Sequence, residues 1–410
     1  MTSRADRPYD LIVFGATSFV GEILCRHLVA RHGVDGDVSW AIAGRSGSKL
    51  ESVAASTGAD VPRIVADAAD TEAMGALADA ARVVISTVGP YALYGSELVA
   101  AVAEAGTDYV DLTGEAQWMQ AMIDAHSATA ERTGARIVHT CGFDSIPSDL
   151  GVWFTQQQAQ ELFGTSCSTI AMRVKAMKGG ASGGTIASIF NMMDEARNDN
   201  ELRKTLANPY ALAPVDMRTG VKQPNVVTPT RDEASGEWVA PFVMAGINTK
   251  VVHRTHALLG LPWGREFRYD EAMLMGSGPR GAAKAGALTG GLGGFMGLAA
   301  FGPARSLLGR FLPDPGEGPS PEAQEAGLFD VRFHGSTDDG QTITTRVTGD
   351  RDPGYGSTAK MLGESATTLL TTNRGAKTGT PGGFWTPATA MGDRLIAALE
   401  AEAGLTFDVL

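Results

Sequence analysis

The stretch LIVFGATSFVG, residues 11–21, decides the fold of the first part of this chain. It begins with four apolar residues, 11–14, which predict a short buried strand, and it continues into a turn bounded by Gly15 and Gly21. Glycine suits both positions, because the chain leaves the strand at the first and the next helix packs closely on the strand at the second. The stretch therefore predicts the strand, turn and helix that open a βαβ unit.

The alternation of short apolar runs and amphipathic helical segments continues to about residue 150. The runs that we expect to be strands are residues 11–14, 38–43, 63–65, 83–87, 109–110 and 136–140. Parallel neighbours in a sheet need a helix-sized connection, and right-handed crossovers place those helices on the faces of the sheet. We therefore predict an α/β protein in which residues 1–150 form a Rossmann domain, a doubly wound parallel sheet with strand order 3-2-1-4-5-6.

Residues 151–350 are expected to form a second α/β domain with a mixed sheet, which would hold the substrate. Its strand-like runs are residues 168–174, 242–249, 266–269, 328–335 and 341–348. Residues 312–327 are rich in proline, glycine and glutamate and predict a linker. Residues 351–410 return to helical patterns, and Thr386 with Pro387 is a typical N-cap and first-turn pair. We expect these C-terminal helices to pack back on the domains.

Residues 285–304, AGALTGGLGGFMGLAAFGPA, contain no charged residue, and basic residues flank them. Their length would permit a membrane span, but the many glycines lower helix propensity and few large apolar side chains are present. We expect a flexible or interfacial segment, with a membrane hairpin or re-entrant contact as the alternative and a complete span as the least expected outcome.

The overall composition excludes several classes of protein. The chain has 410 residues, of which 43% are hydrophobic and 20% charged, and this fits a folded protein of two or more domains. Its 34 Lys and Arg against 46 Asp and Glu give a net charge of −12, which argues against a nucleic-acid partner. The three cysteines have no CxxC spacing, so neither a disulfide framework nor a metal site is indicated. The N-terminus has no signal-peptide pattern, and we expect a cytoplasmic protein.

The turn after the first strand is predicted to bind the pyrophosphate of a dinucleotide through the amides at the start of the next helix. A serine stands where a GxxGxxG pattern has its central glycine, and its hydroxyl could donate to a phosphate. An empty glycine-rich turn is the alternative. The residues expected to form the site are Gly15, Thr17, Ser18, Phe19, Val20 and Gly21.

The end of the second strand distinguishes the two nicotinamide cofactors. Residues 41–46, AIAGRS, carry an arginine and no acid at the strand tip. An acid there would accept hydrogen bonds from the ribose hydroxyls of NAD, whereas an arginine pairs with the 2′-phosphate of NADP. Arg45 therefore predicts NADP(H), with a solvated turn arginine as the alternative.

Two further strand ends are expected at the same edge of the sheet, where open α/β sheets bind their ligands. Val88, Gly89 and Pro90 follow the fourth strand and are expected to pass close to the nicotinamide ribose. Asp67 follows the third strand and is placed to meet the adenine. An ordinary turn is the alternative for both segments.

Five motifs together resemble one family. They are GATSFVG at 15–21, AGRS at 43–46, STVGPYALYG at 86–95, GTDYVDLTGE at 106–115 and CGFDSIPSDLG at 141–151. The combination resembles the saccharopine dehydrogenase-like oxidoreductases, and within them the trans-acting enoyl reductases of phthiocerol-type lipid biosynthesis. The similarity continues through residues 182–188, 352–355 and 386–393, so it covers most of the chain.

The resemblance implies an NADP-dependent oxidoreductase that reduces the enoyl double bond of a fatty acyl or polyketide chain on a polyketide synthase carrier, in complex lipid or glycolipid biosynthesis. It also makes residues 285–304 a candidate for peripheral contact with lipid at the inner face of the plasma membrane. A homodimer is left open.

Reduction of an enoyl thioester places negative charge on the carbonyl oxygen and requires a proton for the α carbon. The candidate catalytic residues lie in loops at strand ends and are Tyr91, Tyr94, Asp144 and Ser145. Packing is the alternative role for the tyrosines, and capping of the helix near Pro147 is the alternative for the other two. The glycine-rich residues 179–185 could bind a phosphopantetheine phosphate or a carboxylate.

Two other functions are left open. A saccharopine-type amino-acid reductase would need clustered cations for its substrate carboxylates, and Arg173, Lys175 and Lys178 are the one compact basic group of the second domain. A non-catalytic NADP-binding scaffold at a lipid surface would keep the cofactor loop and Arg45 without oxidising NADPH.

Overall fold

The computed structural model describes residues 6–179, 190–191, 193–197, 199–300, 318–373 and 379–410. The chain divides into two compact units, the first of Met1–Ile146 with Gly354–Gly404 and the second of Pro147–Pro353 with Leu405–Leu410. Each unit contains one sheet of seven strands. The C-terminal part of the chain therefore contributes to both units.

The sheet of the first unit is parallel throughout, with the order β13-β6-β5-β4-β1-β2-β3. Its strands are β1 (Tyr9–Phe14), β2 (Trp40–Gly44), β3 (Arg63–Val65), β4 (Ala81–Ser86), β5 (Asp108–Asp111), β6 (Arg136–Val138) and β13 (Gly383–Trp385). The predicted order of the first six strands is confirmed. The C-terminal region, which we expected to be helical, adds β13 beside β6.

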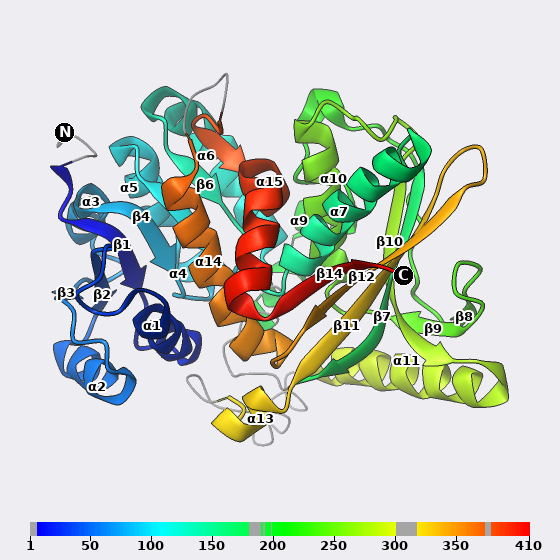
Figure 1. Cartoon of the computed structure of the whole chain (residues 1–410), viewed down its shortest axis with the longest axis horizontal. Helices are drawn as coiled ribbons and strands as arrows, with labels where there is room; N and C mark the ends of the chain where they lie inside the picture. Colours follow the sequence, from blue (N-terminus) through cyan, green and yellow to red (C-terminus); the bar gives the residue numbers. More distant parts are fainter. Residues whose placement is uncertain (1–5, 180–189, 192, 198, 301–317, 374–378) are drawn as a thin grey trace. The chain divides into compact units, whose positions relative to one another are not determined.

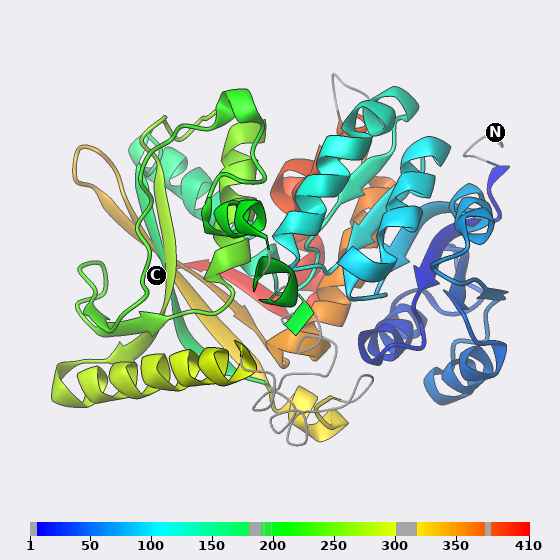
Figure 2. The same cartoon turned by 180° about the vertical axis from the view of Figure 1, so that it is seen from behind.

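Helices cover both faces of this sheet, as buried parallel strands require. They are α1 (Phe19–His32), α2 (Gly47–Thr57), α3 (Thr71–Ala80), α4 (Tyr91–Tyr94), α5 (Ser96–Ala105), α6 (Ala116–Thr133), α14 (Thr358–Thr371) and α15 (Pro387–Ala398), with the helical turns η3 (Pro353–Ser357) and η4 (Leu399–Ala403). Figure 1 shows α1, α14 and α15 on one face, and Figure 2 shows α3, α5 and α6 on the other. Thr386 caps α15 as predicted, with Pro387 in its first turn.

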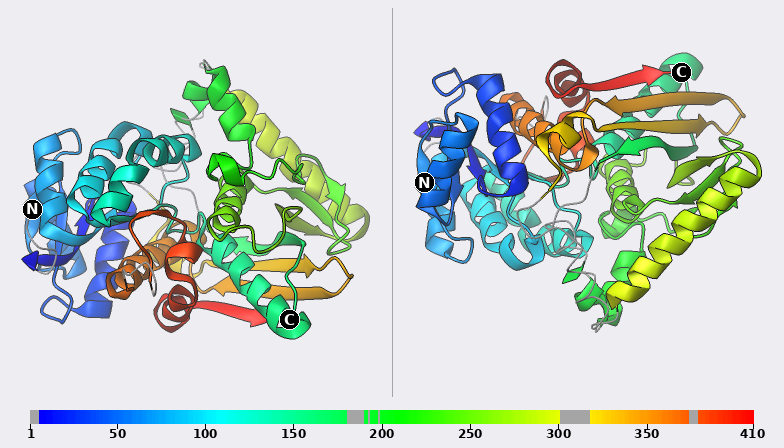
Figure 3. Two further views of the ribbon diagram at one scale, coloured as in Figure 1. Left: turned by 90° about the horizontal axis from the view of Figure 1, so that it is seen from above. Right: turned by 90° about the horizontal axis from the view of Figure 1, so that it is seen from below.

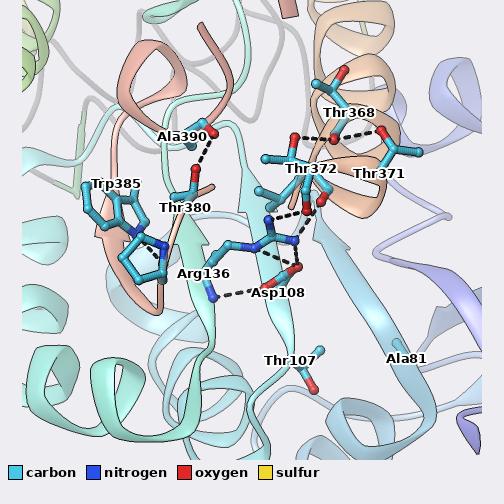
Figure 4. Close-up of polar contacts among 12 residues, drawn as sticks. Ala81, Thr107, Asp108, Arg136, Thr368, Thr371, Thr372, Thr380, Trp385 and Ala390 are labelled. Carbon is cyan, nitrogen blue, oxygen red and sulfur yellow. Dashed lines mark hydrogen bonds and ion pairs between the residues drawn. The ribbon is translucent and has the colours of Figure 1, made fainter. Parts of the chain in front are cut away.

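A buried arginine attaches α14 to the sheet (Figure 4). Arg136 on β6 forms an ion pair with Asp108 on β5, and both side chains are buried. The guanidinium also donates to the carbonyl oxygens of Leu369 at 2.7 Å and Thr372 at 2.9 Å, at the end of α14. The last carbonyls of a helix lack partners within the helix and carry partial negative charge, so a cation there is favourable. One side chain thus connects three elements.

The second unit has a mixed sheet, as predicted, with the order β14-β12-β11-β7-β10-β9-β8. Its strands are β7 (Thr169–Lys178), β8 (Thr230–Arg231), β9 (Trp238–Pro241), β10 (Arg268–Gly276), β11 (Leu328–Ser336), β12 (Thr342–Gly349) and β14 (Leu405–Val409). The β7 and β10 pair is parallel, and the other pairs are antiparallel. Figure 3 shows β14 at one edge of this sheet and the helix α11 toward the opposite edge, where it packs on β9 and β10.

The helices of this unit correct one predicted strand. They are α7 (Ile146–Phe163), α9 (Asn200–Ala207), α10 (Ala245–Leu258), α11 (Gly278–Ala300) and α13 (Pro321–Glu325), with the turn η2 (Val215–Met217). Residues 242–249 were expected to be a strand, but α10 begins at Ala245 and the strand β9 ends before it. From Val251 to Ala257 the helix is buried on all sides, polar residues included. Because polar as well as apolar side chains of this helix are buried, its polar residues do not mark a solvent-exposed face in the sequence.

The glycine-rich segment expected to be flexible or interfacial is helical as far as the structure describes it. Residues 285–300 belong to α11, which packs on β9 and β10. No helix in the described parts of the chain is long and apolar enough to cross a bilayer. Residues 301–304 and 312–317 lie outside the described residues, and the rest of the expected linker contains the short helix α13.

Candidate functional site

The turn between β1 and α1 is held by its own hydroxyl groups. Ser18 is the N-cap of α1, and its Oγ accepts a hydrogen bond from the Gly21 amide at 2.9 Å. The same Oγ lies 2.9 Å from Oγ1 of Thr87, which donates to the Gly15 carbonyl at 2.8 Å. Since the Thr87 hydrogen is used in that bond, the Ser18 hydroxyl donates to Thr87. A serine at the central position of the turn therefore stabilises the loop, and its hydroxyl is engaged before any ligand arrives.

Two glycines are required by the close approach of neighbouring backbone. Gly15 has a φ of +91°, and a Cβ there would lie 2.6 Å from Oγ1 of Thr87 and 2.7 Å from a methyl group of Val88. A Cβ on Gly21 would lie 2.3 Å from the Gly15 carbonyl oxygen. The loops after β1 and β4 are therefore in direct contact. Thr17, Phe19 and Val20, the other predicted members of the loop, are partly exposed beside them.

Arg45 stands at the tip of β2 with its side chain exposed. It forms no hydrogen bond or ion pair with any residue that the structure describes, so its guanidinium is available to a ligand. Asp67, predicted to meet the adenine, accepts a hydrogen bond from the Ala69 amide at 3.0 Å. Its side chain thus stabilises the turn after β3, and the residue is exposed.

The loop after β4 contains the predicted tyrosines in two different environments. Tyr91 is buried, and its hydroxyl donates to the Ser86 carbonyl at 3.0 Å and accepts from the Leu112 amide at 3.4 Å. Burial raises the pKa of Tyr91 well above its ordinary value. Tyr94 is 44% exposed, and its phenol forms no hydrogen bond with the described residues. Of the two phenols, only that of Tyr94 is accessible to a substrate. Val88 and Pro90 are partly exposed and Gly89 is exposed.

Asp144 and Ser145 follow β6 and directly precede α7, which begins at Ile146 as the sequence predicted for a helix near Pro147. The Ser145 amide donates to the Thr140 carbonyl at 2.9 Å. Ser145 is fully buried, and its Oγ has no partner among the described residues. All four candidate catalytic residues therefore follow the carboxyl ends of β4 or β6. Residues 180–185 of the glycine-rich loop lie outside the described residues.

Two acids that sequence reasoning did not single out organise this edge of the sheet. Asp111, the last residue of β5, accepts a hydrogen bond through Oδ2 from Nδ1 of His139 at 2.6 Å. Glu115 accepts hydrogen bonds from the amides of Tyr91 and Ala92, each at 2.9 Å. Both acids were quoted only within the GTDYVDLTGE motif. Ligands of open α/β sheets bind at the carboxyl ends of the strands, and this reasoning, which pointed to Asp67 after β3, would also have pointed to Asp111 at the end of β5.

The basic group of the second unit is paired within the chain. Arg173 on β7 forms buried ion pairs with Asp232 at 2.6 Å and Asp270 at 3.0 Å. Lys175 lies 3.4 Å from Glu237. Arg173 is therefore neutralised by two buried acids of this unit, whereas the pair of Lys175 with Glu237 is partly exposed.

Comparison with known proteins agrees with this geometry. Residues 11–138 match the model of the saccharopine dehydrogenase NADP binding domain. The chain is 40% identical over 412 residues to a Mycobacterium tuberculosis protein with the provisional name of trans-acting enoyl reductase, covering 96% of each chain. It is 37% identical to the trans-acting enoyl reductase of Mycobacterium ulcerans, covering 97% of each.

A solved structure shows the same fold. Apo saccharopine dehydrogenase (L-Glu forming) from Saccharomyces cerevisiae is similar with a TM-score of 0.55 over 98% of this chain and 100% of that chain, at 14% identity. The NADP binding domain and the cation at the tip of β2 make NADP(H) the cofactor of the first unit. Near full-length identity of 37 to 40% establishes the closer relationship: this chain belongs to the trans-acting enoyl reductase family.

Proposed function

We propose that the protein uses NADPH to reduce the enoyl double bond of a fatty acyl or polyketide chain carried by a polyketide synthase, in complex lipid biosynthesis. The observation that carries the proposal is the exposed cation Arg45 at the tip of β2, which pairs with no residue that the structure describes, in a chain similar over nearly its whole length to trans-acting enoyl reductases. When bound, NADPH supplies a hydride to the β carbon of the enoyl group. The protein then has to stabilise the carbonyl oxygen and deliver a proton to the α carbon.

The proposed catalytic residues are Tyr91, Tyr94, Asp144 and Ser145, which follow the carboxyl ends of β4 and β6. Tyr94 is the proposed proton donor, because its phenol is exposed while that of Tyr91 is engaged with Ser86. The Tyr91 ring and the Ser145 hydroxyl are buried and suit a role in shaping the site around the substrate carbonyl.

The function is tested by NADPH oxidation with purified full-length protein. We expect turnover with an enoyl thioester on CoA or on an acyl carrier domain, and a saturated acyl product by mass spectrometry. Turnover with 2-aminoadipate semialdehyde and glutamate, but not with enoyl thioesters, would contradict the proposal. NADPH binding with no turnover across enoyl and imine substrates would favour a non-catalytic scaffold.

The amino-acid reductase alternative has lost its main support. It required clustered cations in the second unit, and Arg173 and Lys175 are both paired with acids. To bind a substrate carboxylate, Arg173 would have to leave two buried ion pairs, which is costly.

Replacement of the cation at the β2 tip should weaken NADPH selectively. We expect Arg45→Ala to raise the Kd for NADPH by roughly 10- to 100-fold, because a charge-assisted hydrogen bond to the 2′-phosphate is lost, and to leave the Kd for NADH unchanged. Isothermal titration measures both constants. Arg26→Ala, which removes an exposed arginine of α1, is the control. Equal effects on the two nucleotides would remove the case for Arg45.

Removal of the exposed phenol should affect chemistry rather than binding. We expect Tyr94→Phe to lower kcat by about 100-fold while the KM for NADPH stays within about twofold, since general acid catalysis contributes at least this much. Tyr9→Phe, a change of the same kind at the start of β1, is the control. An unchanged kcat in Tyr94→Phe would show that the proton comes from another group.

Peripheral contact with lipid at the inner face of the plasma membrane is proposed for α11. The helix exposes Met296 and Leu298 near its end and the cations Arg280 and Lys284 near its start. Apolar side chains combined with cations suit an anionic lipid surface. We expect co-sedimentation with phosphatidylglycerol vesicles that Met296→Ser with Leu298→Ser abolishes. Vesicle binding that does not depend on Met296 and Leu298 would contradict the lipid contact.

A homodimer is also proposed. The sedimentation coefficient of the protein without vesicles tests it.

A further inference from the structure

The loop after β5, residues 111–115, connects the loops that follow the two neighbouring strands. Asp111 accepts hydrogen bonds through Oδ1 from the amides of Thr113 and Thr140, each at 3.1 Å. Thr113 in turn accepts from the Glu115 amide at 3.1 Å through its hydroxyl. Asp111 therefore joins this loop to the loop after β6, and Glu115 joins it to the loop after β4.

Glu115 makes the connection to the β4 loop with both carboxylate oxygens. Oε1 accepts from the Tyr91 amide and Oε2 from the Ala92 amide, each at 2.9 Å, and the residue is only 3% exposed. These are the first two amides of α4, which have no acceptor within their own helix. Hydrogen bonds to an ionised acceptor are about twice as strong as neutral ones, and burial strengthens them further. Glu115 thus caps α4 from 23 residues away in the sequence.

The packing around α4 leaves this segment little freedom to move. The Trp118 ring on α6 packs on the Tyr91 ring with centroids 5.4 Å apart, and its indole nitrogen donates to Ser96 at 3.0 Å. A Cβ on Gly95 would lie 2.6 Å from the Trp118 ring, so the turn between α4 and α5 rests directly on that side chain. With Glu115 holding its other end, α4 fixes the position of the preceding Gly89 and Pro90.

We propose that Glu115 is a positioning residue for the nicotinamide half of NADPH. In the sheet order, β2 lies on one side of β1 and β4 on the other, and β5 lies beyond β4. Arg45 at the tip of β2 marks the side of the adenosine 2′-phosphate, so the nicotinamide lies over the β4 side, where Gly89 is exposed and its neighbours Val88 and Pro90 are partly exposed. Glu115 acts through these residues and does not touch the cofactor itself. The inference rests on the proposed NADPH site.

Two ligands separate the nicotinamide half from the adenosine half. 2′,5′-ADP contains the 2′-phosphate and the adenosine but lacks the nicotinamide. We expect Glu115→Gln to raise the Kd for NADPH by about 10-fold. The glutamine side chain replaces one carboxylate oxygen by an NH2 group, so one of the two backbone amides of α4 loses its acceptor. The same variant should bind 2′,5′-ADP within about twofold of the unmodified protein. Arg45→Ala should weaken both ligands.

The control is Asp70→Asn in the same unit. Asp70 also caps a helix, since Oδ1 accepts from the amides of Glu72 at 3.0 Å and Ala73 at 3.1 Å, but α3 follows β3, the edge strand that lies beyond β2 in the sheet order. The Asp70→Asn substitution also removes a carboxylate charge that caps a helix. It should leave the Kd for NADPH and the Kd for 2′,5′-ADP unchanged. An equal loss of NADPH and 2′,5′-ADP binding in Glu115→Gln, or no loss of either, would overturn the inference. If the unmodified protein binds neither ligand, the proposed NADPH site itself fails.

Amide exchange in the unmodified protein provides a second measurement, which does not depend on the folding of a variant. Because Glu115 already holds the amides of Tyr91 and Ala92, we expect both to exchange slowly without cofactor. Rapid exchange that slows only when NADPH is added would show that the cofactor orders this segment and that Glu115 does not position it in advance.

Discussion

Arg136→Met is expected to lower the stability of the first unit by about 3 to 5 kcal/mol, as breaking one partner of a buried ion pair commonly does. The substitution leaves the Asp108 carboxylate buried without its cation. It also removes the donors of the Leu369 and Thr372 carbonyls at the end of α14. The midpoint of chemical unfolding, measured by tryptophan fluorescence, and the Tm from calorimetry both test the loss.

A half-exposed pair in the same unit provides the matched control. Arg82 contacts Asp10 at 2.7 Å with 38% of its side chain exposed, so Arg82→Met should cost less than about 1 kcal/mol. Adding Asp108→Leu to Arg136→Met should recover part of the loss, because the uncompensated charge is then gone. If Arg136→Met resembles the control, the buried contact does not hold α14 in place.

Glu271→Gln is expected to raise the stability of the second unit by about 3 kcal/mol at pH 8 and to change it little below pH 4.5. Burial raises the pKa of Glu271 from its ordinary 4.5 to about 7. The folded chain therefore keeps a proton that the unfolded chain releases between these two values. Stability of the unmodified protein should fall as the pH rises from about 4.5 to about 7, and then level off.

The amide can use the same surroundings without the charge. The Tyr269 hydroxyl donates to Oε1 of Glu271 at 2.7 Å, and the Asn248 side-chain nitrogen donates to Oε2 at 2.9 Å. Oδ1 of Asn248 has no partner among the described residues, so a rotated Asn248 side chain would accept from the new amide nitrogen. The negative charge of Asp270 also raises the pKa of Glu271.

Calorimetry between pH 4 and pH 8 distinguishes this effect from a general response to acid. Glu201→Gln removes an exposed carboxylate of α9 and should leave the pH profile of the protein unchanged. Loss of the slope between about pH 4.5 and pH 7 in Glu271→Gln alone would confirm the assignment. An unmodified protein whose second unit becomes more stable over that range would contradict it.

Local patterns were sufficient for the first six strands of the first unit and for its cofactor. The run 11–14 with Gly15 predicted β1 and its turn, because a buried parallel strand and a sharp exit from it both have sequence signals. Arg45 indicated NADP(H) by its position alone, and Thr386 with Pro387 located the start of α15. Each of these predictions depends on residues that are neighbours in the chain.

Long-range contacts decided what those patterns could not. The pairing of β13 with β6 and the contact of Arg136 with Thr372 join residues separated by more than two hundred positions. The buried polar helix α10 hid its period, since its surroundings and not its composition made it helical. Tyr91 is a further case, because the acceptor of its amide is Glu115, which lies 24 positions away in the sequence. The sequence alone determined which residues reach the edge of the sheet, because the end of a strand is marked by residues that are neighbours in the chain. Only the tertiary structure decided which of them remain free to bind a ligand, because a buried polar group takes whatever partner folding brings to it.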